Sequence, residues 1–322
     1  MSNSAFLLLS YGSPEQENDV IPFLKNILDR NLSSRNISPQ IIEQTIETAA
    51  AKYRRFAAET GYYSPLNKEC KILLNGIKQE LQFLVPSCDI PVYFGNLFWH
   101  PLLNDTVMQM KQDGIQHAVC FATSAFDSTS GNKRYSDALA ISCRNAGLEP
   151  DFITKVPLPF REKLFIESQA DVLLEALSWS ALDNLSANEN DRTKIIFTAH
   201  SIPLSDDRQQ TYREQLLETS VKITDAIHSD LPWELAFQSA SGKNELWLQP
   251  DVNARIRSLA EEGKYKNVVI SPLGFFCENT ETQYDLDIET RTVCRENGIG
   301  YYRARAAGTS PKIYRMIAEL VH

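Results

Sequence analysis

The chain has 322 residues, of which 43% are apolar and 23% charged, and its net charge is −9 at pH 7. Such a composition is typical of a globular protein with one large or two medium domains. The negative charge argues against nucleic acid as the main partner, which would favour a basic face.

Membrane insertion and export are also disfavoured. No apolar run approaches the roughly 18–20 residues that a membrane-spanning helix needs. The short run at residues 5–9 lacks the basic leader of a signal peptide. Six scattered cysteines without a C-x-x-C pair suit reduced thiols. We therefore expect a cytoplasmic protein without integral membrane contact.

Two halves of the chain repeat one order of predicted elements. In each half, apolar strands alternate with helical patterns, and the second strand leads through a proline into a helix that ends at a glycine. This repeated alternation predicts two similar doubly wound, Rossmann-like α/β domains whose parallel sheets face a cleft. In chain order, the predicted strands are residues 6–9, 91–96 and 117–122, then 194–197, 235–239 and 267–271; the prolines are Pro101 and Pro250, and the glycines Gly114 and Gly263.

The domain limits follow from this repeat. We place an N-terminal domain at residues 1–160 and a C-terminal domain at residues 161–307, with the segment 308–322 packing back on the first domain. Matching the halves puts Tyr11 and His200 at equivalent strand ends, one in each domain. Their loops are then expected to face each other across the cleft.

His200 follows a predicted strand and precedes Ser205-Asp206-Asp207, which is typical of a helix N-cap with an acidic first turn. Ligands of open α/β sheets bind at such strand ends. A histidine can exchange a proton near neutral pH. The alternative is a loop histidine satisfied by local hydrogen bonds.

An acidic row follows the third strand of the second half. If residues 278–289 are helical, Glu281, Asp285 and Glu289 line one face, with Glu278 nearby. Like charges four residues apart destabilise a helix by about 0.2–0.5 kcal/mol each. A solvated face would tolerate this, and so would a site that handles cations or protons, because carboxylates suit divalent metals. With His200, these three carboxylates form the candidate metal-handling set.

Ordered motifs across nearly the whole chain resemble those of ferrochelatases. The His200-Ser-Ile-Pro loop and the Glu281-x-x-Tyr-Asp285 motif are the specific ones. The stretches 123–126 and 238–251 are similar to the branch that acts on coproporphyrin III. The other matching segments are residues 11–14, 64–66, 95–101 and 272–275, and Tyr135 accompanies the stretch 123–126.

The resemblance implies a chelatase-like fold and a lyase of heme biosynthesis that inserts Fe²⁺ into coproporphyrin III to form coproheme. It implies that His200 and Glu281 are the catalytic pair, and that Asp285 and Glu289 continue the acidic row. It also implies that Tyr11 approaches iron from the opposite face of the porphyrin. The implied porphyrin contacts are Tyr11, Arg30, Ser64 and Tyr135, and other heme-pathway enzymes are candidate partners.

The expected chemistry agrees with these residue types. Metal insertion requires the loss of two pyrrole protons, which a histidine can accept. Nearby carboxylates can relay protons or help to remove water from iron. The substrate carboxylates need cationic or hydroxyl anchors, for which the further candidates are Lys52, Arg54, Arg55, Lys133 and Arg134.

Two departures from the family pattern matter. The loop at residues 56–65 is longer than the usual Gly-Gly turn, which affects the propionate contacts. Some relatives hold a [2Fe–2S] cluster through a mid-chain cysteine and several C-terminal cysteines. Here Asn132 stands near the mid-chain position, and no cysteine follows Cys294. We therefore expect no cluster and no permanently bound cofactor, with Fe²⁺ as a substrate.

Three alternatives stay open from the sequence. The substrate can be protoporphyrin IX instead of coproporphyrin III. The protein can be a non-catalytic tetrapyrrole carrier or sensor, although a carrier needs no proton acceptor such as His200. A periplasmic-type metal-binding protein is disfavoured by the lack of an export signal.

Overall fold

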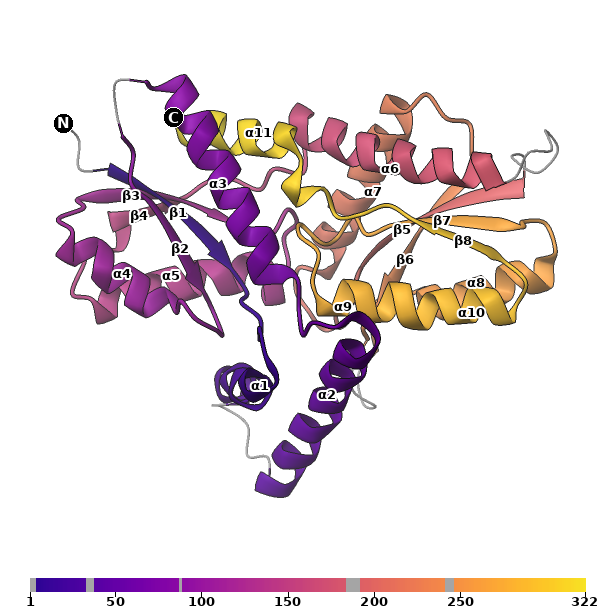
Figure 1. Cartoon of the computed structure of the whole chain (residues 1–322), viewed down its shortest axis with the longest axis horizontal. Helices are drawn as coiled ribbons and strands as arrows, with labels where there is room; N and C mark the ends of the chain where they lie inside the picture. Colours follow the sequence, from indigo (N-terminus) through magenta and orange to yellow (C-terminus); the bar gives the residue numbers. More distant parts are fainter. Residues whose placement is uncertain (1–3, 33–37, 87–88, 184–191, 241–245) are drawn as a thin grey trace. The chain divides into compact units, whose positions relative to one another are not determined.

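The computed structural model describes residues 4–32, 38–86, 89–183, 192–240 and 246–322 (Figure 1). The chain divides into two compact units. The first contains Met1–Thr123 and Tyr135–Val156, with Val321, and the second contains Ser124–Arg134 and Pro157–Leu320, with His322. The segment Ser124–Arg134 therefore belongs to the second unit, although it interrupts the first in sequence.

The first unit is built on a four-stranded parallel sheet in the order β2-β1-β3-β4. From Ala5 to Ser10, every residue of β1 is buried, because this strand lies inside the sheet with helices around it. The strands are β1 (Ser4–Ser10), β2 (Val92–Asn96), β3 (His117–Ala122) and β4 (Ile153–Lys155). The helices are α1 (Glu17–Leu32), α2 (Pro39–Thr60), α3 (Leu66–Leu84), α4 (Leu103–Gln112) and α5 (Arg134–Asn145), with a short 3₁₀-helix η2 (Pro150–Phe152).

The second unit repeats this plan with the order β6-β5-β7-β8, again all parallel. Helices cover both faces of its sheet (Figure 1). The strands are β5 (Thr193–His200), β6 (Trp233–Gln238), β7 (Asn267–Ser271) and β8 (Gly300–Arg303). The helices are η1 (Thr129–Lys133), α6 (Lys163–Asp183), α7 (Gln209–Ala226), α8 (Val252–Glu262), α9 (Thr280–Thr282), η4 (Gln283–Thr290), α10 (Arg291–Glu296), η5 (Ala307–Thr309) and α11 (Pro311–Val321).

The two sheets show that the predicted pair of doubly wound α/β units is correct. Strands β1, β5 and β7 are almost entirely buried, which explains why they appear in the sequence as continuous apolar runs. Within the described residues, no helix is long and apolar enough to cross a membrane.

Matching hydrogen bonds align the two halves residue by residue. The N–H groups of Phe6 in β1 and Ile195 in β5 each donate to a proline carbonyl just before the neighbouring strand, at 2.9 and 3.0 Å. Tyr11 follows Phe6 by the same number of residues as His200 follows Ile195. The predicted equivalence of Tyr11 and His200 is thereby confirmed. A second matched pair of bonds joins Asn96 to Pro101 and Phe237 to Pro250, both at 2.8 Å.

The helix after His200 begins later than the sequence predicts. It starts at Gln209, not at Ser205, and no side chain caps it. The Asp206 carboxylate instead accepts from the Arg208 N–H at 2.9 Å and from the Thr129 hydroxyl at 2.8 Å. The Arg208 side chain is held by Asp127 at 2.7 Å. These contacts keep the acidic residues in a turn, so the predicted N-cap is wrong.

Candidate active site at the ends of strands β5 and β6

His200 is the last residue of β5 and is partly exposed. Its Nδ1 is hydrogen-bonded to the Ser201 carbonyl. Because a carbonyl oxygen only accepts, Nδ1 carries the proton and Nε2 keeps a free lone pair in the neutral ring. The His200 carbonyl accepts from the Tyr212 hydroxyl at 3.1 Å, and burial raises the pKa of Tyr212, which keeps this donor protonated. The histidine is thus oriented with Nε2 available as a base.

The loop after His200 is fixed by the segment that follows β6. The Ser201 N–H donates to the Gln238 carbonyl at 2.8 Å, and its hydroxyl donates to the Leu248 carbonyl at 3.0 Å. The Leu248 N–H donates back to Ile202 at 3.0 Å. Two motifs that lie far apart in the sequence therefore hold the loop after His200 in place.

A glycine lets the acidic segment pass close to His200. The Gly274 N–H donates to the Thr198 carbonyl at 2.9 Å. A Cβ at this position would lie 2.4 Å from the Cβ of Ala199, so no other residue fits without a shift. The chain then enters α9, where the Glu281 Oε2 lies 3.9 Å from the His200 Nε2. The structure therefore brings the two predicted catalytic residues together.

The rest of the acidic row follows a wider helix than expected. Residues Gln283–Thr290 form a π-helix, in which hydrogen bonds run to the fifth residue and not to the fourth. Asp285 is buried and its carboxylate accepts from the Ser239 hydroxyl, whereas Glu289 is half-buried. Over the part of the chain that the structure describes, no three His, Cys, Asp or Glu side chains converge as a metal-binding group. Asp285 and Glu289 are therefore not gathered around His200 and Glu281 as one ligand set.

Two other acidic residues of this segment serve a different purpose. Arg303 in β8 donates a hydrogen bond of 2.8 Å to Glu278 and two hydrogen bonds of 2.7 and 2.8 Å to Asp287. Burial disfavours the charged guanidinium, but Glu278 and Asp287 outweigh this and raise the pKa of Arg303. Glu278, which the sequence places near the acidic row, is thus turned toward a buried ion-pair network.

Ser239 and Arg303 are residues of this site whose roles the sequence does not predict. Ser239 has a φ of +62°, which is uncommon for a residue other than glycine and is a backbone signal that the sequence does not reveal. Arg303 lies in a strand far along the chain from its partners. Both act by holding members of the acidic segment in place.

In the first unit, two of the predicted porphyrin contacts, Tyr11 and Tyr135, lie near strand ends. The half-buried Tyr11 ring packs against Phe98, with 4.5 Å between ring centroids. The Ser64 hydroxyl accepts from the Leu66 N–H at 3.3 Å. Tyr135 is only 5% exposed, with its hydroxyl 3.4 Å from that of Thr123. The Arg30 side chain lies outside the described residues.

The candidate cations of helix α2 lie on its surface and are paired locally. Arg54 contacts Glu47 at 3.3 Å, and Arg55 contacts Glu59 at 3.2 Å. Such exposed pairs contribute only about 0–1 kcal/mol and are easily exchanged for another anion.

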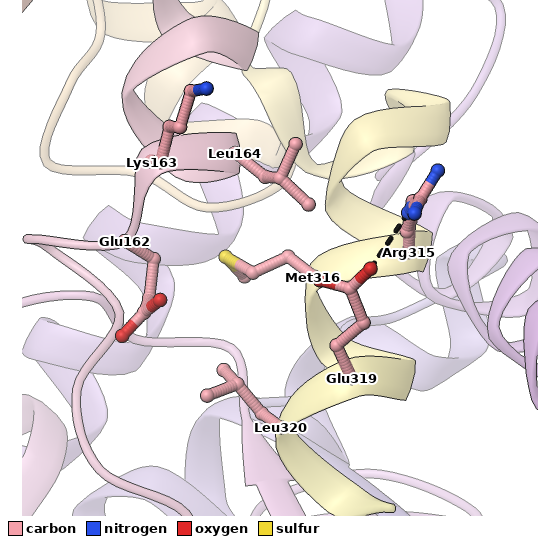
Figure 2. A pocket seen from close by; sticks show the side chains of 7 residues that line it. All are labelled: Glu162, Lys163, Leu164, Arg315, Met316, Glu319 and Leu320. Atoms are coloured by element: carbon pink, nitrogen blue, oxygen red, sulfur yellow. Dashed lines mark hydrogen bonds and ion pairs between the residues drawn. The ribbon is translucent and has the colours of Figure 1, made fainter.

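A separate hollow of about 350 Å³ lies in the second unit between the start of α6 and α11 (Figure 2). Met316 extends into it, and Arg315 is paired with Glu319 beside it at 2.7 Å. None of the predicted site residues lines this hollow, so it is not part of the candidate active site.

The two parallel four-stranded sheets are a fold that solved structures of a chelatase also have. Two solved structures share this fold at 10% sequence identity. One is the sirohydrochlorin chelatase SirB from Bacillus subtilis subspecies spizizenii in complex with cobalt, with a TM-score of 0.50, and the other is SirB from Bacillus subtilis with Fe³⁺, with a TM-score of 0.57. Each comparison covers 100% of this chain and 94% of the other.

Sequence comparison gives the family itself. The Ferrochelatase family model matches residues 3–322. A ferrochelatase from Rhodopirellula baltica is 36% identical over 318 residues, covering 98% of this chain and 85% of the relative. A coproporphyrin III ferrochelatase from Nocardia farcinica is 33% identical over 330 residues, covering 100% and 88%. The chain belongs to the ferrochelatase family and is a metal chelatase.

Proposed function

We propose that this chelatase inserts Fe²⁺ into coproporphyrin III to form coproheme. The observation that carries the chemistry is the His200 Nε2, held as a free base 3.9 Å from the Glu281 carboxylate. The choice of coproporphyrin is supported by the motifs at residues 123–126 and 238–251 and by relatives that are named coproporphyrin III ferrochelatases.

His200 acts as the proton acceptor. Its Nε2 takes a pyrrole proton while Nδ1 stays bonded to the Ser201 carbonyl, so the ring keeps its orientation in both charge states. The imidazolium formed in this way is stabilised by the Glu281 carboxylate. Because the Glu281 side chain is 58% exposed, it can pass the proton to water and reset the pair for the second deprotonation.

The acidic helix handles iron in transit. Glu281 and the half-buried Glu289 offer hard oxygen ligands that can replace water around Fe²⁺ without forming a closed cage. Asp285 is buried and bonded to Ser239, so we assign it to shaping the helix and its local charge. Weak and separated ligands suit an ion that must leave for the porphyrin.

The first unit supplies the porphyrin contacts. We assign Tyr11 and Ser64, which are accessible, to direct contact, and the buried Tyr135 to support through Thr123. The exposed Arg54 and Arg55 are candidates for the substrate carboxylates, because their present partners are surface glutamates. Arg30 keeps its expected role as a further anchor.

We expect no resident cofactor. An iron–sulfur cluster needs several cysteine ligands, and Asn132 stands near the position of the mid-chain cysteine that some relatives use. Action in the cytoplasm, next to other enzymes of heme synthesis, is part of the same proposal.

The test is an anaerobic assay with Fe²⁺ and either coproporphyrin III or protoporphyrin IX. We expect metallation of both, with a higher kcat/KM for coproporphyrin III. An equal or higher value for protoporphyrin IX would contradict the substrate assignment. Porphyrin binding without any metallation would favour the carrier alternative instead.

A further inference from the structure

The π-helical form of the acidic segment needs an explanation. Over Gln283–Thr290 it runs for eight residues, whereas π-helices mostly occur as single turns within α-helices. The row of like charges does not by itself favour a π-helix, because a solvated α-helix would also tolerate these charges. Contacts from neighbouring elements must therefore hold the wider turn.

Thr290, the last residue of the π-helix, makes a contact that only this form allows. It is fully buried, and its hydroxyl donates to the Asp285 carbonyl, five residues back, at 2.8 Å. In α-helices a threonine hydroxyl bonds three or four residues back. Thr219 and Thr224 of α7 do so, to Gln215 at 2.8 Å and to Ser220 at 3.0 Å. The Thr290 bond matches the π-helical spacing.

A second element fixes the same hydroxyl. The Thr290 hydroxyl has one hydrogen and two acceptors at 2.8 Å, the Asp285 carbonyl and the Asn253 Oδ1 near the start of α8, and it shares its donation between them. This end of α8 is itself rigid, because the Asp251 side chain accepts from the Ala254 N–H at 2.9 Å and Val252 is buried in the core. Thr290 is thus anchored to a stable part of the unit.

Asp285, the middle residue of the acidic row, is consequently held by hydrogen bonds to both its backbone carbonyl and its carboxylate. Its carbonyl accepts from Thr290, and its carboxylate accepts from Ser239 at the end of β6. Glu281 lies one turn before this fixed point. The geometry of the Asp285 anchor therefore sets the direction from which Glu281 reaches His200.

We propose that Thr290, supported by Asn253, is a positioning residue that keeps the acidic helix in its π form and so places Glu281 beside the His200 Nε2. The proposal rests on the function proposed above. Without the hydroxyl, the segment can adopt the ordinary four-residue ladder. For each residue by which the helical register shifts, Glu281 then turns by about 100° around the helix axis relative to Glu289.

The test compares three threonine variants. Thr290→Val keeps the shape and removes the hydroxyl, Thr290→Ser keeps the hydroxyl, and Thr219→Val removes a hydroxyl of equal burial from an ordinary α-helix of the same unit. We expect Thr290→Val to lower kcat by about 10²-fold, as misplaced catalytic groups do. Porphyrin affinity, measured by fluorescence quenching, should stay unchanged. Thr290→Ser should restore most of the turnover, and Thr219→Val should lose stability but keep wild-type kinetics.

A structural measurement tests the role of Thr290 independently of the proposed function. A crystal structure of Thr290→Val should show bonds to the fourth residue over 283–290 and a longer distance from Glu281 to His200. If the π-helix persists, or if kinetics match those of Thr219→Val, the proposal is overturned. Should Thr290→Val fail to fold, Asn253→Ala should show the same change to a smaller degree, and wild-type kinetics there would overturn it too. A wild-type protein that metallates no porphyrin would refute the proposed function alone, because the structural arm needs no activity.

Discussion

Tyr11 and His200 occupy the same position in the two repeated sheets, just beyond matched hydrogen-bonded strand residues. One half presents a phenol at this strand end and the other an imidazole. In the second half, the Glu281 carboxylate lies 3.9 Å from the ring nitrogen. The duplicated fold thus supplies two equivalent strand ends; we assign the first to porphyrin contact and the second to proton transfer.

Replacing His200 should abolish metal insertion. His200→Ala removes the Nε2 base, and loss of a general base costs about 10²–10⁴-fold in rate. Porphyrin affinity should change little, and single-turnover metallation under anaerobic conditions measures the effect. His228→Asn is the control, because His228 is an exposed loop histidine with a φ of +50° that asparagine tolerates. Near-normal turnover in His200→Ala would refute the assignment.

We expect substitutions in the acidic helix to fall into two groups, those that lower the rate of metal insertion and those that weaken the use of iron. Glu281→Gln should mainly lower kcat, because it removes the charge next to the imidazolium. Glu289→Gln and Asp285→Asn should mainly raise the KM for iron. Asp287→Asn removes the same charge from the same helix, but its carboxylate serves Arg303. It should therefore lower the melting temperature and leave iron kinetics intact; identical iron profiles in all four variants would show a merely solvated helix face.

Substrate preference should depend on helix α2. A charge-assisted hydrogen bond contributes about 1.5–3 kcal/mol, which corresponds to roughly a tenfold or larger preference for the substrate with more propionates. Arg55→Ala should therefore reduce the ratio of kcat/KM for coproporphyrin III over protoporphyrin IX. Arg315→Ala is a matched control, since both arginines are exposed and paired with a glutamate four residues on. An unchanged ratio in Arg55→Ala and Arg54→Ala would remove these arginines as anchors.

The purified protein should contain no iron–sulfur cluster. Asn132 stands near the position of the mid-chain cysteine that holds the cluster in some relatives, and among the described residues no three His, Cys, Asp or Glu side chains form a group that could hold a metal. We expect no visible absorption without ligand and no acid-labile sulfide. Stoichiometric sulfide in anaerobically purified protein would contradict this prediction.

Acid stability should depend on an ion pair remote from the active site. A hydrogen bond from Arg161, and then one from Lys222, lowers the pKa of Glu218 from 4.5 to about 2. A carboxyl with a lowered folded-state pKa stabilises the fold above its unfolded value and loses this effect as the pH falls toward 2. Unfolding curves of wild type and Glu218→Gln should therefore differ most above pH 4.5 and converge near pH 2. A constant difference across this range would argue against the pair.

Much of this protein is determined by its sequence. The repeated apolar strands, with their prolines and glycines at matched places, predicted both sheets and the equivalence of Tyr11 and His200. They did so because strand burial, helix termination and turn formation are local properties of the chain. The His-Ser-Ile-Pro loop and the acidic motif predicted the candidate site through their resemblance to ferrochelatases.

Only the tertiary structure decided how the acidic residues divide their roles. Glu278 and Asp287 face Arg303, Asp285 is bonded to Ser239, and Glu281 lies beside His200. The α-helical spacing predicted the wrong arrangement of these residues, because the segment is a π-helix. Hydrogen bonds from Thr290 to α8, and from Ser239 at the end of β6 to Asp285, hold this form. These partners lie far apart along the chain, and a contact between distant residues depends on how the sheet and helices pack, which no local pattern of residues encodes.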